Sequence, residues 1–351
     1  VLEMGMNHPG EIAALCKIAD PDVVAITSVA PAHVGFLGSV RRVAIAKSEI
    51  LTASRPGVRA FLPADSEFLP LLTRRAKGKT VSTFGIGPTA ELRLKNPRPS
   101  IKTISFEVSP LRHSRESGNP VGFGIGPDAR MRGHDNLFRC PNFGEHQLTN
   151  VLLSVGIAGA FAVPLKKIQS AVSRLCIPPG RGELVRAGPH ILINDSYNAN
   201  PASMSAALDR IHRMKRMLEE RNKRVRYDII LILGDMLELG SQAGSIHRRL
   251  GSQAAAIKPW RLLFAGGMGN EVQKGFLKAG GRRDAVICVD SNEGAASHLR
   301  QWLQGTKRYL VLLKASHQIR LDFILSQSLM ETRGNDGEIA DVKKSSIPTN
   351  N

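Results

Sequence analysis

In the second half of the chain, short runs of aliphatic residues recur with helical patterns between them. These runs read HILIND, YDIILILGD, RLLFAGG, AVICVD and YLVLLKAS, and each is apolar through its centre instead of alternating with polar residues. A strand that is apolar on both sides must be covered on both faces, and strand–helix alternation does this by laying parallel strands between two layers of helices. The pattern therefore predicts a Rossmann-like α/β domain over residues 185–331.

Residues 1–184 predict a second α/β domain, and 351 residues are enough for two domains that each bury a core. Aliphatic runs at 22–30 and 58–65 predict buried strands, and Ser39 is a candidate N-cap for a helix between them that carries Lys47. Further along, the segments that predict antiparallel strands lie within residues 79–108, and those that predict helices lie at 143–161 and 163–175.

Residues 112–136 interrupt this pattern, because they have little apolar periodicity and many turn-forming residues. Their wording resembles the translation of a dispersed palindromic DNA repeat, which predicts a surface insertion with no part in catalysis. Residues 332–351 are largely polar and predict a frayed tail.

The chain carries 48 lysines and arginines against 30 acidic residues, a net charge of +18 that attracts polyanions. Its densest basic stretch, residues 212–226, predicts a helix with a solvated face, because it lacks the interleaved aromatic rings that stack on bases. Nucleic-acid binding is therefore the less favoured interpretation.

The four cysteines are widely spaced, which argues against a zinc site or a disulfide framework. No apolar run approaches the roughly 20 residues that cross a bilayer, and a signal-peptide pattern is absent, so we expect a cytoplasmic chain without a membrane partner.

Polar residues that directly follow aliphatic runs are the first candidates for a site. Open α/β sheets bind their ligands beyond the carboxyl ends of the strands, where such residues lie. Each of them alone is more typical of a helix cap, a turn or a structural residue than of a site. They are Glu3, His33, Asp195, Asp235 and Lys314.

Three residues of the first domain together indicate a site for a metal ion. Glu3 and His33, at the ends of two strands of one sheet, can converge on a hard cation such as Mg²⁺. Lys47 lies on the next helix, where partial burial would depress the pKa of its amine and open it to covalent modification. From the residues alone, we predict a metal-dependent phosphate site in an α/β enzyme.

Six longer motifs point to a family. They follow one another as EMGMNHPGEI (3–12), APAHVGFLGSVRRVAIAKSEIL (30–51), FGEHQLTNVLLSVGIA (143–158), PPGRGE (178–183), NDSYNANPASMSAAL (194–208) and LGDMLELGSQAGSIHRRLG (233–251). In this order they resemble the Mur ligases. Three of them, EMGMN, DSYNANP and GDMLELG, resemble the members that add D-alanyl-D-alanine to UDP-N-acetylmuramoyl-tripeptide in peptidoglycan precursor synthesis. The resemblance implies an α/β fold with a central ATPase domain, truncated at its start, followed by a C-terminal Rossmann-like domain.

For the metal site, the resemblance implies that Glu3 and His33 are magnesium ligands. Lys47 matches the family's carbamylated lysine, whose new carboxylate acts in catalysis and helps to bind a second Mg²⁺. The expected cofactors are therefore ATP and two magnesium ions, and the expected substrates are UDP-N-acetylmuramoyl-tripeptide and D-alanyl-D-alanine.

For the nucleotide, Asn150 matches the family's adenine-contacting asparagine, Arg181 the arginine near the ATP phosphates, and Asp195 the aspartate that contacts the ribose. The structural alternatives for the same residues are a helix-face amide, a turn arginine and an N-cap for the helix that starts near Pro201. Tyr197, Asn198 and Asn200 lie in the loop after Asp195, where the family brings its C-terminal domain against the nucleotide.

Lys314 matches the lysine of the family's KGSR motif, but the sequence here reads KASH. Ala315 and His317 therefore stand where the family has glycine and arginine, which puts a close backbone approach and a fixed charge at that edge in doubt. Asp235 and Glu238 are expected to cap the turn after their strand instead of binding a ligand.

The family's reaction explains these residue types. The γ-phosphoryl group of ATP is transferred to the terminal carboxylate of the tripeptide, and the amine of D-alanyl-D-alanine then displaces phosphate from the acyl phosphate. Three anions meet in the first step, so Mg²⁺, lysine and arginine are needed to offset their charge.

Two other interpretations stay open. One is a related ligase, such as a lysine- or diaminopimelate-adding Mur enzyme or folylpolyglutamate synthase, and the other is a decayed remnant or a basic fragment that binds nucleic acid.

A GxxGK[ST] phosphate loop and, in this family, a whole UDP-binding domain are expected before Glu3, and the sequence contains neither. We expect that Val1 is not a natural start, that the strand ending near it has lost its lead-in, and that the chain is a monomer. We predict that the purified 351-residue chain alone does not form the acyl phosphate, because the loop supplies backbone N–H donors, a cation and a metal ligand. Detection of the ATP-dependent joined product by mass spectrometry would contradict this prediction.

Overall fold

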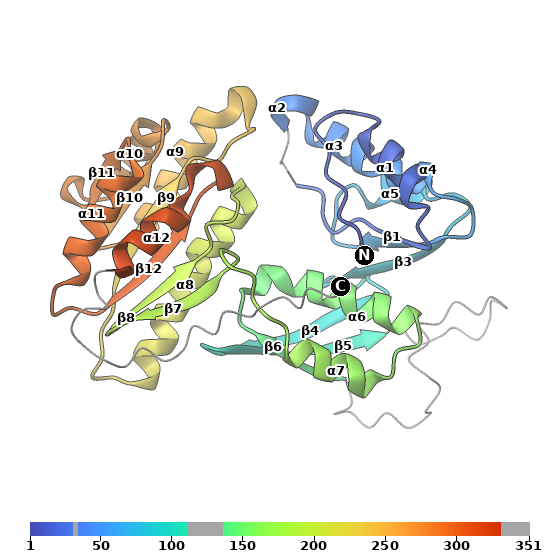
Figure 1. Cartoon of the computed structure of the whole chain (residues 1–351), viewed down its shortest axis with the longest axis horizontal. Coiled ribbons are helices and arrows are strands. Elements are labelled where there is room, and N and C mark those ends of the chain that lie inside the picture. Colours follow the sequence, from blue (N-terminus) through green and yellow to red (C-terminus); the bar gives the residue numbers. More distant parts are fainter. Residues whose placement is uncertain (31–33, 111–135, 331–351) are drawn as a thin grey trace, which may run out of the picture.

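The computed structural model describes residues 1–30, 34–110 and 136–330. Within these ranges the chain forms two six-stranded sheets, with strand orders β1-β2-β3-β4-β5-β6 and β11-β10-β9-β12-β8-β7, and helices pack on both (Figure 1). The predicted α/β class is confirmed. Almost all of the predicted insertion and the polar tail lie outside the described residues. No helix in the described ranges combines the length and apolarity needed to cross a bilayer.

The first sheet is mixed, with parallel strands at one side and antiparallel strands at the other. Its strands are β1 (Val23–Ala25), β2 (Arg59–Pro63), β3 (Thr80–Gly85), β4 (Leu92–Pro99), β5 (Thr103–Pro110) and β6 (Leu137–Pro141). The strand predicted over residues 22–30 is shorter than expected, and residues 1–6 form no strand although one was expected to end there.

The prediction of antiparallel strands within residues 79–108 is correct for the β4–β5 pair but wrong for β3, which pairs with β4 in parallel. The reason lies in the turn after β3. The Asp65 carboxylate accepts hydrogen bonds from the backbone nitrogens of Ile86 (2.7 Å) and Gly87 (2.8 Å), which holds this turn against the end of β2. After this turn, the first residues of β4 lie beside the last residues of β3 and run in the same direction.

The helices of this first part follow the expected pattern with one break. Ser39 caps its helix as predicted, since its hydroxyl accepts a hydrogen bond from the Arg42 backbone nitrogen at 3.3 Å. The helix then divides at Ser48, whose hydroxyl bonds back to the Ile45 carbonyl oxygen at 2.7 Å. The elements are α1 (Glu11–Ala19), α2 (Val34–Leu37), α3 (Val40–Lys47), α4 (Glu49–Ala53), α5 (Leu69–Arg75), η1 (Glu145–Gln147), α6 (Leu148–Ala160) and α7 (Leu165–Ser173).

The second sheet has the Rossmann-like layout that the aliphatic runs predict. Strands β8 to β12 all pair in parallel, and β7 joins the edge as an antiparallel neighbour of β8. The strands are β7 (Glu183–Ala187), β8 (His190–Asn194), β9 (Asp228–Gly234), β10 (Arg261–Ala265), β11 (Val286–Val289) and β12 (Tyr309–Lys314). The helices are α8 (Pro201–Arg221), η2 (Gly240–Gln242), α9 (Ala243–Ala256), α10 (Gly269–Lys278), η3 (Arg283–Ala285), α11 (Asn292–Leu303), η4 (His317–Ile319) and α12 (Leu321–Met330).

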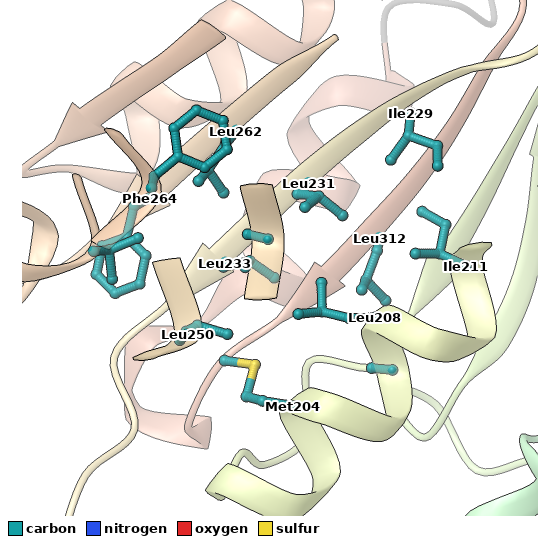
Figure 2. Close-up of a cluster of buried hydrophobic side chains, with 14 of the residues drawn as sticks. Met204, Leu208, Ile211, Ile229, Leu231, Leu233, Leu250, Leu262, Phe264 and Leu312 are labelled. Carbon is teal, nitrogen blue, oxygen red and sulfur yellow. The ribbon is translucent and has the colours of Figure 1, made fainter. Parts of the chain in front are cut away.

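Alternate residues of the central strands serve two separate cores. Leu231 and Leu233 of β9 pack in one cluster with side chains of α8, α9 and α10, and Figure 2 shows the members from α8 and α9. Ile230 and Ile232 of the same strand pack with side chains of α11 and α12. Because successive side chains of a strand point to opposite faces, this division explains why the run is apolar at every position.

Helices α9 and α10 touch through glycine. A Cβ atom at Gly275 would overlap the carbonyl oxygen of Arg248, and one at Gly251 would overlap the carbonyl oxygen of Val272. We predict that Gly275→Ala lowers the free energy of unfolding by about 1–3 kcal/mol or more, because backbone atoms cannot yield as a flexible side chain does. Urea denaturation measures this change. Gly244→Ala in α9 is the matched control, since its nearest neighbour is the Glu271 side chain at 3.8 Å, and a similar loss in that variant would contradict the packing explanation.

Candidate functional site

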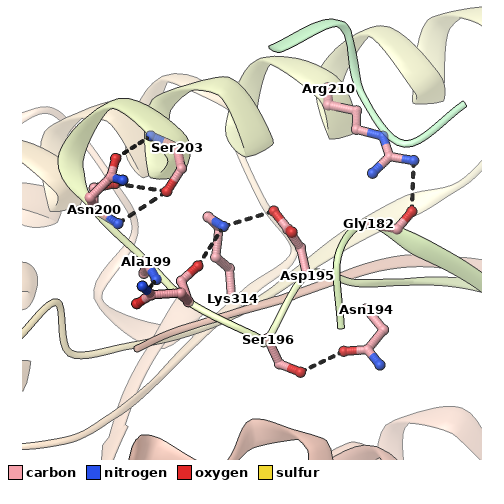
Figure 3. Close-up of polar contacts among 10 residues, drawn as sticks. Gly182, Asn194, Asp195, Ser196, Ala199, Asn200, Ser203, Arg210 and Lys314 are labelled. Atoms are coloured by element: carbon pink, nitrogen blue, oxygen red, sulfur yellow. Dashed lines mark hydrogen bonds and ion pairs between the residues drawn. The ribbon is translucent and has the colours of Figure 1, made fainter. Parts of the chain in front are cut away.

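A buried ion pair joins the carboxyl ends of two neighbouring strands. Asp195 directly follows β8 and Lys314 is the last residue of β12, and the two strands pair in parallel with Leu313 opposite Asn194. The Lys314 Nζ donates to Asp195 Oδ2 at 2.8 Å and to the Asn198 carbonyl oxygen at 2.9 Å (Figure 3). Lys314 is 2% exposed and Asp195 is 6% exposed. Two of the predicted strand-end residues are therefore direct partners.

The ion pair lies in an environment that opposes charge. Burial lowers the pKa of Lys314, and the nearby Asp195 carboxylate acts in the opposite direction by stabilising the ammonium group. Only Oδ2 of Asp195 is engaged within the described residues, so Oδ1 is left to accept a hydrogen bond from a ligand. Each charge offsets the desolvation cost of the other, because an isolated charge is costly to bury.

The loop after Asp195 is held by the start of α8. Asn200 is the N-cap of that helix, since its Oδ1 accepts from the Ser203 backbone nitrogen at 2.9 Å and its own backbone nitrogen donates to the Ser203 hydroxyl at 3.0 Å. The structural alternative that made Asp195 the N-cap is therefore wrong. Asn198 is exposed, and it contributes its backbone carbonyl to Lys314.

Arg181 and His317 both contact Tyr197 beside this region. The Arg181 guanidinium carbon lies 3.9 Å from the centre of the Tyr197 ring. The His317 ring centre lies 5.5 Å from that of Tyr197, with the two rings tilted by 47°. The histidine of KASH thus contacts the same tyrosine as the predicted phosphate-site arginine. Ala315 is fully buried against Gly234, which leaves room for the extra methyl group because it has no side chain.

A cavity of about 230 Å³ opens between the segments that follow β8, β9 and β12. It is lined by residues 197–200, 237–239 and 316–318. Two hydrogen bonds fix its floor, one from the Leu237 backbone nitrogen to the Ser316 hydroxyl (3.0 Å) and one from the Ser316 backbone nitrogen to the Asp235 carbonyl oxygen (3.0 Å). The cavity therefore lies at the end of the sheet where ligands are expected.

Asp235 has a structural position. Its carboxylate accepts from the backbone nitrogens of Gly267 (2.8 Å) and Met268 (3.1 Å), at the start of α10. Glu238 has a positive φ of 63°, and its carbonyl oxygen accepts from the Gly35 backbone nitrogen at 2.8 Å. This bond links the two halves of the chain, and it holds Glu238 at the edge of the cavity that residues 237–239 help to line.

Arg210 and His146 lie beside the ion pair and were not predicted as site residues. Arg210 is 5% exposed, and its Nη2 donates to the carbonyl oxygens of Asn142 (2.6 Å) and Gly182 (2.9 Å). Its Nε and Nη1 have no hydrogen-bond partner within the described residues. Burial lowers the pKa of Arg210 to about 10, which leaves it charged near neutral pH. Its position among the buried residues of α8 was the signal, because an arginine at an apolar helical position needs a partner.

His146 feels every charge of this region. Burial lowers its pKa to about 4, the Asp195 carboxylate acts to raise it, and Lys314, Arg210 and Arg213 act to lower it further. The imidazole is therefore neutral near pH 7. Arg213 also reaches Glu145 of η1 at 3.2 Å, and Arg210 bonds to Asn142 just before η1, so two arginines of α8 hold this part of the chain.

The residues predicted for the metal site are only partly described. Glu3 is exposed, and its carboxylate makes no hydrogen bond or ion pair within residues 1–30, 34–110 and 136–330. Lys47 Nζ donates to the Ser28 carbonyl oxygen at 2.8 Å, and burial lowers its pKa in the expected direction. His33 lies outside the described residues. In the described part of the chain, no three His, Cys, Asp or Glu side chains gather as metal ligands, so the metal-ligand role of Glu3, His33 and Lys47 stays a prediction.

Asn150 lies exposed in the first turn of α6. Its Nδ2 donates to Gln147 Oε1 at 2.7 Å, an interaction within one helical segment. This geometry agrees with the helix-face alternative and leaves the adenine contact as a prediction. The structure thus brings together Asp195, Lys314, Arg181 and Tyr197, and it places Asn150 on the segment that α8 contacts.

Comparison with known proteins gives matches over both halves of the chain. Residues 1–158 match the Mur ligase middle domain and residues 180–317 match the Mur ligase, glutamate ligase domain. The chain is 28% identical over 327 residues to UDP-N-acetylmuramoyl-tripeptide--D-alanyl-D-alanine ligase of Bacillus subtilis, covering 93% of this chain and 63% of that protein. The ligase of the same name from Treponema pallidum is also 28% identical, with 92% and 61% covered.

Solved structures show the same fold. MurF from Acinetobacter baumannii superposes with a TM-score of 0.75 at 23% identity, covering 94% of this chain and 64% of that one. MurF from Thermotoga maritima in complex with ADP gives 0.72 at 22% identity, with 95% and 67% covered. The chain therefore spans slightly less than two thirds of the length of the curated relatives named above.

The buried ion pair leads to a stability prediction. Lys314→Met leaves the Asp195 carboxylate buried without its partner, so we expect the free energy of unfolding to fall by about 3–5 kcal/mol. The double variant Asp195→Asn/Lys314→Met removes both charges and should recover much of that loss. The exposed pair of Lys307 with Asp228 is the control, and Lys307→Met should change stability by about 1 kcal/mol or less. Equal losses in the Lys314 and Lys307 variants would contradict this prediction.

The lowered pKa of His146 predicts a pH dependence of stability. The unfolded chain takes up a proton on this residue near the ordinary histidine value of about 6.5, whereas the folded chain does so only near pH 4. The contribution of neutral His146 to the free energy of unfolding is therefore complete above about pH 6.5, and it falls as the pH drops toward 4. About 2 kcal/mol is lost by pH 5. In urea denaturation, the free energy of unfolding of His146→Gln should fall less between pH 7.5 and 5 than that of the parent. The exposed control His212→Gln should lose as much as the parent does.

Proposed function

This chain belongs to the Mur ligase family, and from that premise we propose that it acts in an ATP-dependent amide ligation. The proposed reaction joins D-alanyl-D-alanine to UDP-N-acetylmuramoyl-tripeptide through an acyl phosphate, as a cytoplasmic step of peptidoglycan precursor synthesis. The substrates are those for which two ligases that are 28% identical to this chain are named. Because the chain spans about 63% of such a relative, the proposal concerns the part of the reaction that these two domains perform.

One observation carries this proposal, the buried Lys314–Asp195 pair at the carboxyl ends of β12 and β8. Lys314 holds one oxygen of the carboxylate, which fixes the direction of the other oxygen. We propose that this second oxygen accepts a hydrogen bond from a ribose hydroxyl of ATP. Arg181, close by over the Tyr197 ring, then offers its guanidinium to the phosphates, where a planar cation can make two parallel hydrogen bonds.

The contact between α8 and the η1 segment supports a nucleotide held by both domains. Asn150 follows η1 closely, and the helix that starts just after the Asp195 loop contacts η1 through Arg213 and the residue Asn142 before it through Arg210. We propose that this contact sets the separation between Asn150, which faces the adenine, and Asp195, which faces the ribose. Neutral His146 keeps a further positive charge away from the same region.

Magnesium would neutralise the phosphates and the developing charge on the transferred group. The proposed ligands are Glu3, His33 and Lys47, the last as a carbamate. Burial favours the neutral amine of Lys47, which is the form that attacks carbon dioxide. In that step an N–C bond forms, the π electron pair of one C=O bond moves to oxygen, and the nitrogen gives up a proton to solvent water. The product is a carboxylate on a side chain that was a cation.

Binding of ADP with Mg²⁺ to the 351-residue chain, measured by isothermal titration calorimetry, tests the nucleotide part of the proposal. Asp195→Asn and Arg181→Met should each weaken binding about tenfold, since each removes a charge-assisted hydrogen bond. Lys307→Met, which changes an exposed lysine at the far end of β12, should bind as the parent does. Equal binding by all four proteins would contradict the assigned site.

A second titration tests the class of the joined amine. With the nucleotide present, D-alanyl-D-alanine should bind to the chain. Diaminopimelate, lysine and glutamate should not bind. Binding of one of those three instead would favour a related ligase. A mobility shift with random duplex DNA that weakens with salt, together with no nucleotide binding, would favour the nucleic-acid interpretation.

A further inference from the structure

One segment of the second domain forms a wall of the cavity and also contacts the first domain. Residues 237–239 line the cavity that opens beyond β8, β9 and β12. The backbone nitrogen of Gly35, in α2, donates to the Glu238 carbonyl oxygen at 2.8 Å. Figure 1 shows α2 at the edge of the first domain that faces the second. We call residues 235–240 the bridging loop, because a shift of this loop would move the cavity wall and the contact with Gly35 together.

The contact with Gly35 leaves little room for the bridging loop to move. A Cβ atom at Gly35 would lie 3.0 Å from the Glu238 carbonyl oxygen, and one at Gly240 would lie 3.3 Å from the Gly35 Cα. Glu238 and Gly240 both have positive φ angles, of 63° and 56°. This left-handed conformation is unfavourable for a glutamate, so it persists only where surrounding interactions hold it. The bridging loop therefore needs interactions that hold it from within the second domain.

His247 of α9 supplies one of these interactions. Its side chain is fully buried, and its Nε2 lies 3.0 Å from the Met236 backbone nitrogen. Its Nδ1 lies 2.8 Å from the Ala243 carbonyl oxygen, in the first turn of α9. Because a carbonyl oxygen only accepts hydrogen bonds, Nδ1 carries the proton and Nε2 is left to accept from the Met236 N–H. His247 therefore ties the start of the bridging loop to α9.

Neighbouring interactions hold the residues on either side and leave the Met236 N–H to His247. The Asp235 carboxylate accepts from two backbone nitrogens at the start of α10, and its Oδ1 lies 3.7 Å from His247 Nε2, beyond hydrogen-bond distance. The Leu237 backbone nitrogen donates to the Ser316 hydroxyl at 3.0 Å. Met236 is 3% exposed, and a buried N–H without an acceptor is costly. Loss of the histidine acceptor should therefore shift the bridging loop.

We propose that His247 is a positioning residue for the candidate site and that it holds the bridging loop in place for the amine substrate. The identity of that substrate, D-alanyl-D-alanine, rests on the proposed function. The dipeptide carries two methyl groups, an ammonium group and a carboxylate, and the wall formed by residues 237–239 offers leucine side chains and the Glu238 carboxylate. His247 lies outside the lining of the cavity, so it acts through the backbone of Met236.

Two substitutions of His247 separate the hydrogen bond from the volume of the ring. His247→Gln keeps a side-chain oxygen that can reach the Met236 N–H, whereas His247→Asn is one carbon shorter and keeps only a donor for the Ala243 carbonyl oxygen. In titration calorimetry with ADP and Mg²⁺ present, D-alanyl-D-alanine should bind His247→Asn about tenfold more weakly than the parent and His247→Gln within about threefold of it. Both variants should bind ADP as the parent does, because Asp195 and Arg181 lie outside the bridging loop. Equal affinities of the Asn variant and the parent for the dipeptide, or equal losses in the Asn and Gln variants, would overturn the proposal.

His190 provides the matched control. It is 3% exposed, and its two ring nitrogens also face backbone groups, the Leu303 carbonyl oxygen at 2.9 Å and the Tyr309 nitrogen at 3.2 Å. It lies at the amino ends of β8 and β12, at the opposite end of the sheet from the cavity. His190→Asn should therefore lower the melting temperature without weakening the binding of D-alanyl-D-alanine. A loss of affinity equal to that of His247→Asn would make general destabilisation the cause and would overturn the proposal.

Amide hydrogen exchange of Gly35, followed by NMR, tests the positioning role without any ligand. His247→Asn should release the bond between Gly35 and Glu238 and speed this exchange about tenfold, although the substitution lies in the other domain. Exchange of the Ile86 amide, which the Asp65 carboxylate holds in the same domain as Gly35, should not change. An unchanged Gly35 rate in His247→Asn would overturn the positioning role. If the parent binds neither ADP nor the dipeptide, the proposed function fails, and the Gly35 rate alone decides the role of His247.

Discussion

The buried pair of Lys314 and Asp195 is the interaction on which the arrangement of the candidate site depends. Both charges leave water when the second domain folds, so each needs the other at hydrogen-bond distance. The pair forms where β8 lies beside β12 in parallel, with their carboxyl ends in register. It also draws the Asn198 carbonyl oxygen toward the ammonium group, which gives the loop its direction. The cavity beside the pair exists because this loop is held away from the segments that follow β9 and β12.

The loop is therefore fixed at both of its ends by different physical interactions. An ion pair holds its start, and the Asn200 capping box holds its end at the first turn of α8. Tyr197, between these points, has the Arg181 guanidinium over its ring and the His317 ring tilted against it. A tyrosine in that position joins the end of β12 to the segment that precedes β7. His317, where the resemblance to the KGSR motif implies arginine, places an aromatic ring next to this tyrosine.

The sequence was sufficient for the sheet of the second domain and for the residues at its strand ends. Apolar runs with helices between them leave little choice other than a covered parallel sheet, and parallel strands put their carboxyl ends at one edge. Which strand-end residues become partners depends on strand order, which periodicity does not encode, so the pairing of Lys314 with Asp195 was not predictable. Arg210 and His146 were missed for a similar reason, because their surroundings come from two domains. The turn between β3 and β4 depends on hydrogen bonds to Asp65, which lies 21 and 22 residues before the donors Ile86 and Gly87.

The charged groups around Asp195 carry an excess of positive charge, which favours the binding of an anion. One carboxylate faces the cations of Lys314 and Arg210, and Arg210 keeps two nitrogens without partners in the described structure. If His146 were protonated, a third cation would be buried in the same region, and burial prevents this near neutral pH. The remaining excess is positive, so the region favours an anionic group without repelling a neutral sugar hydroxyl from Asp195. A nucleotide has both parts, and this balance is the physical link between the buried ion pair and the proposed ligand.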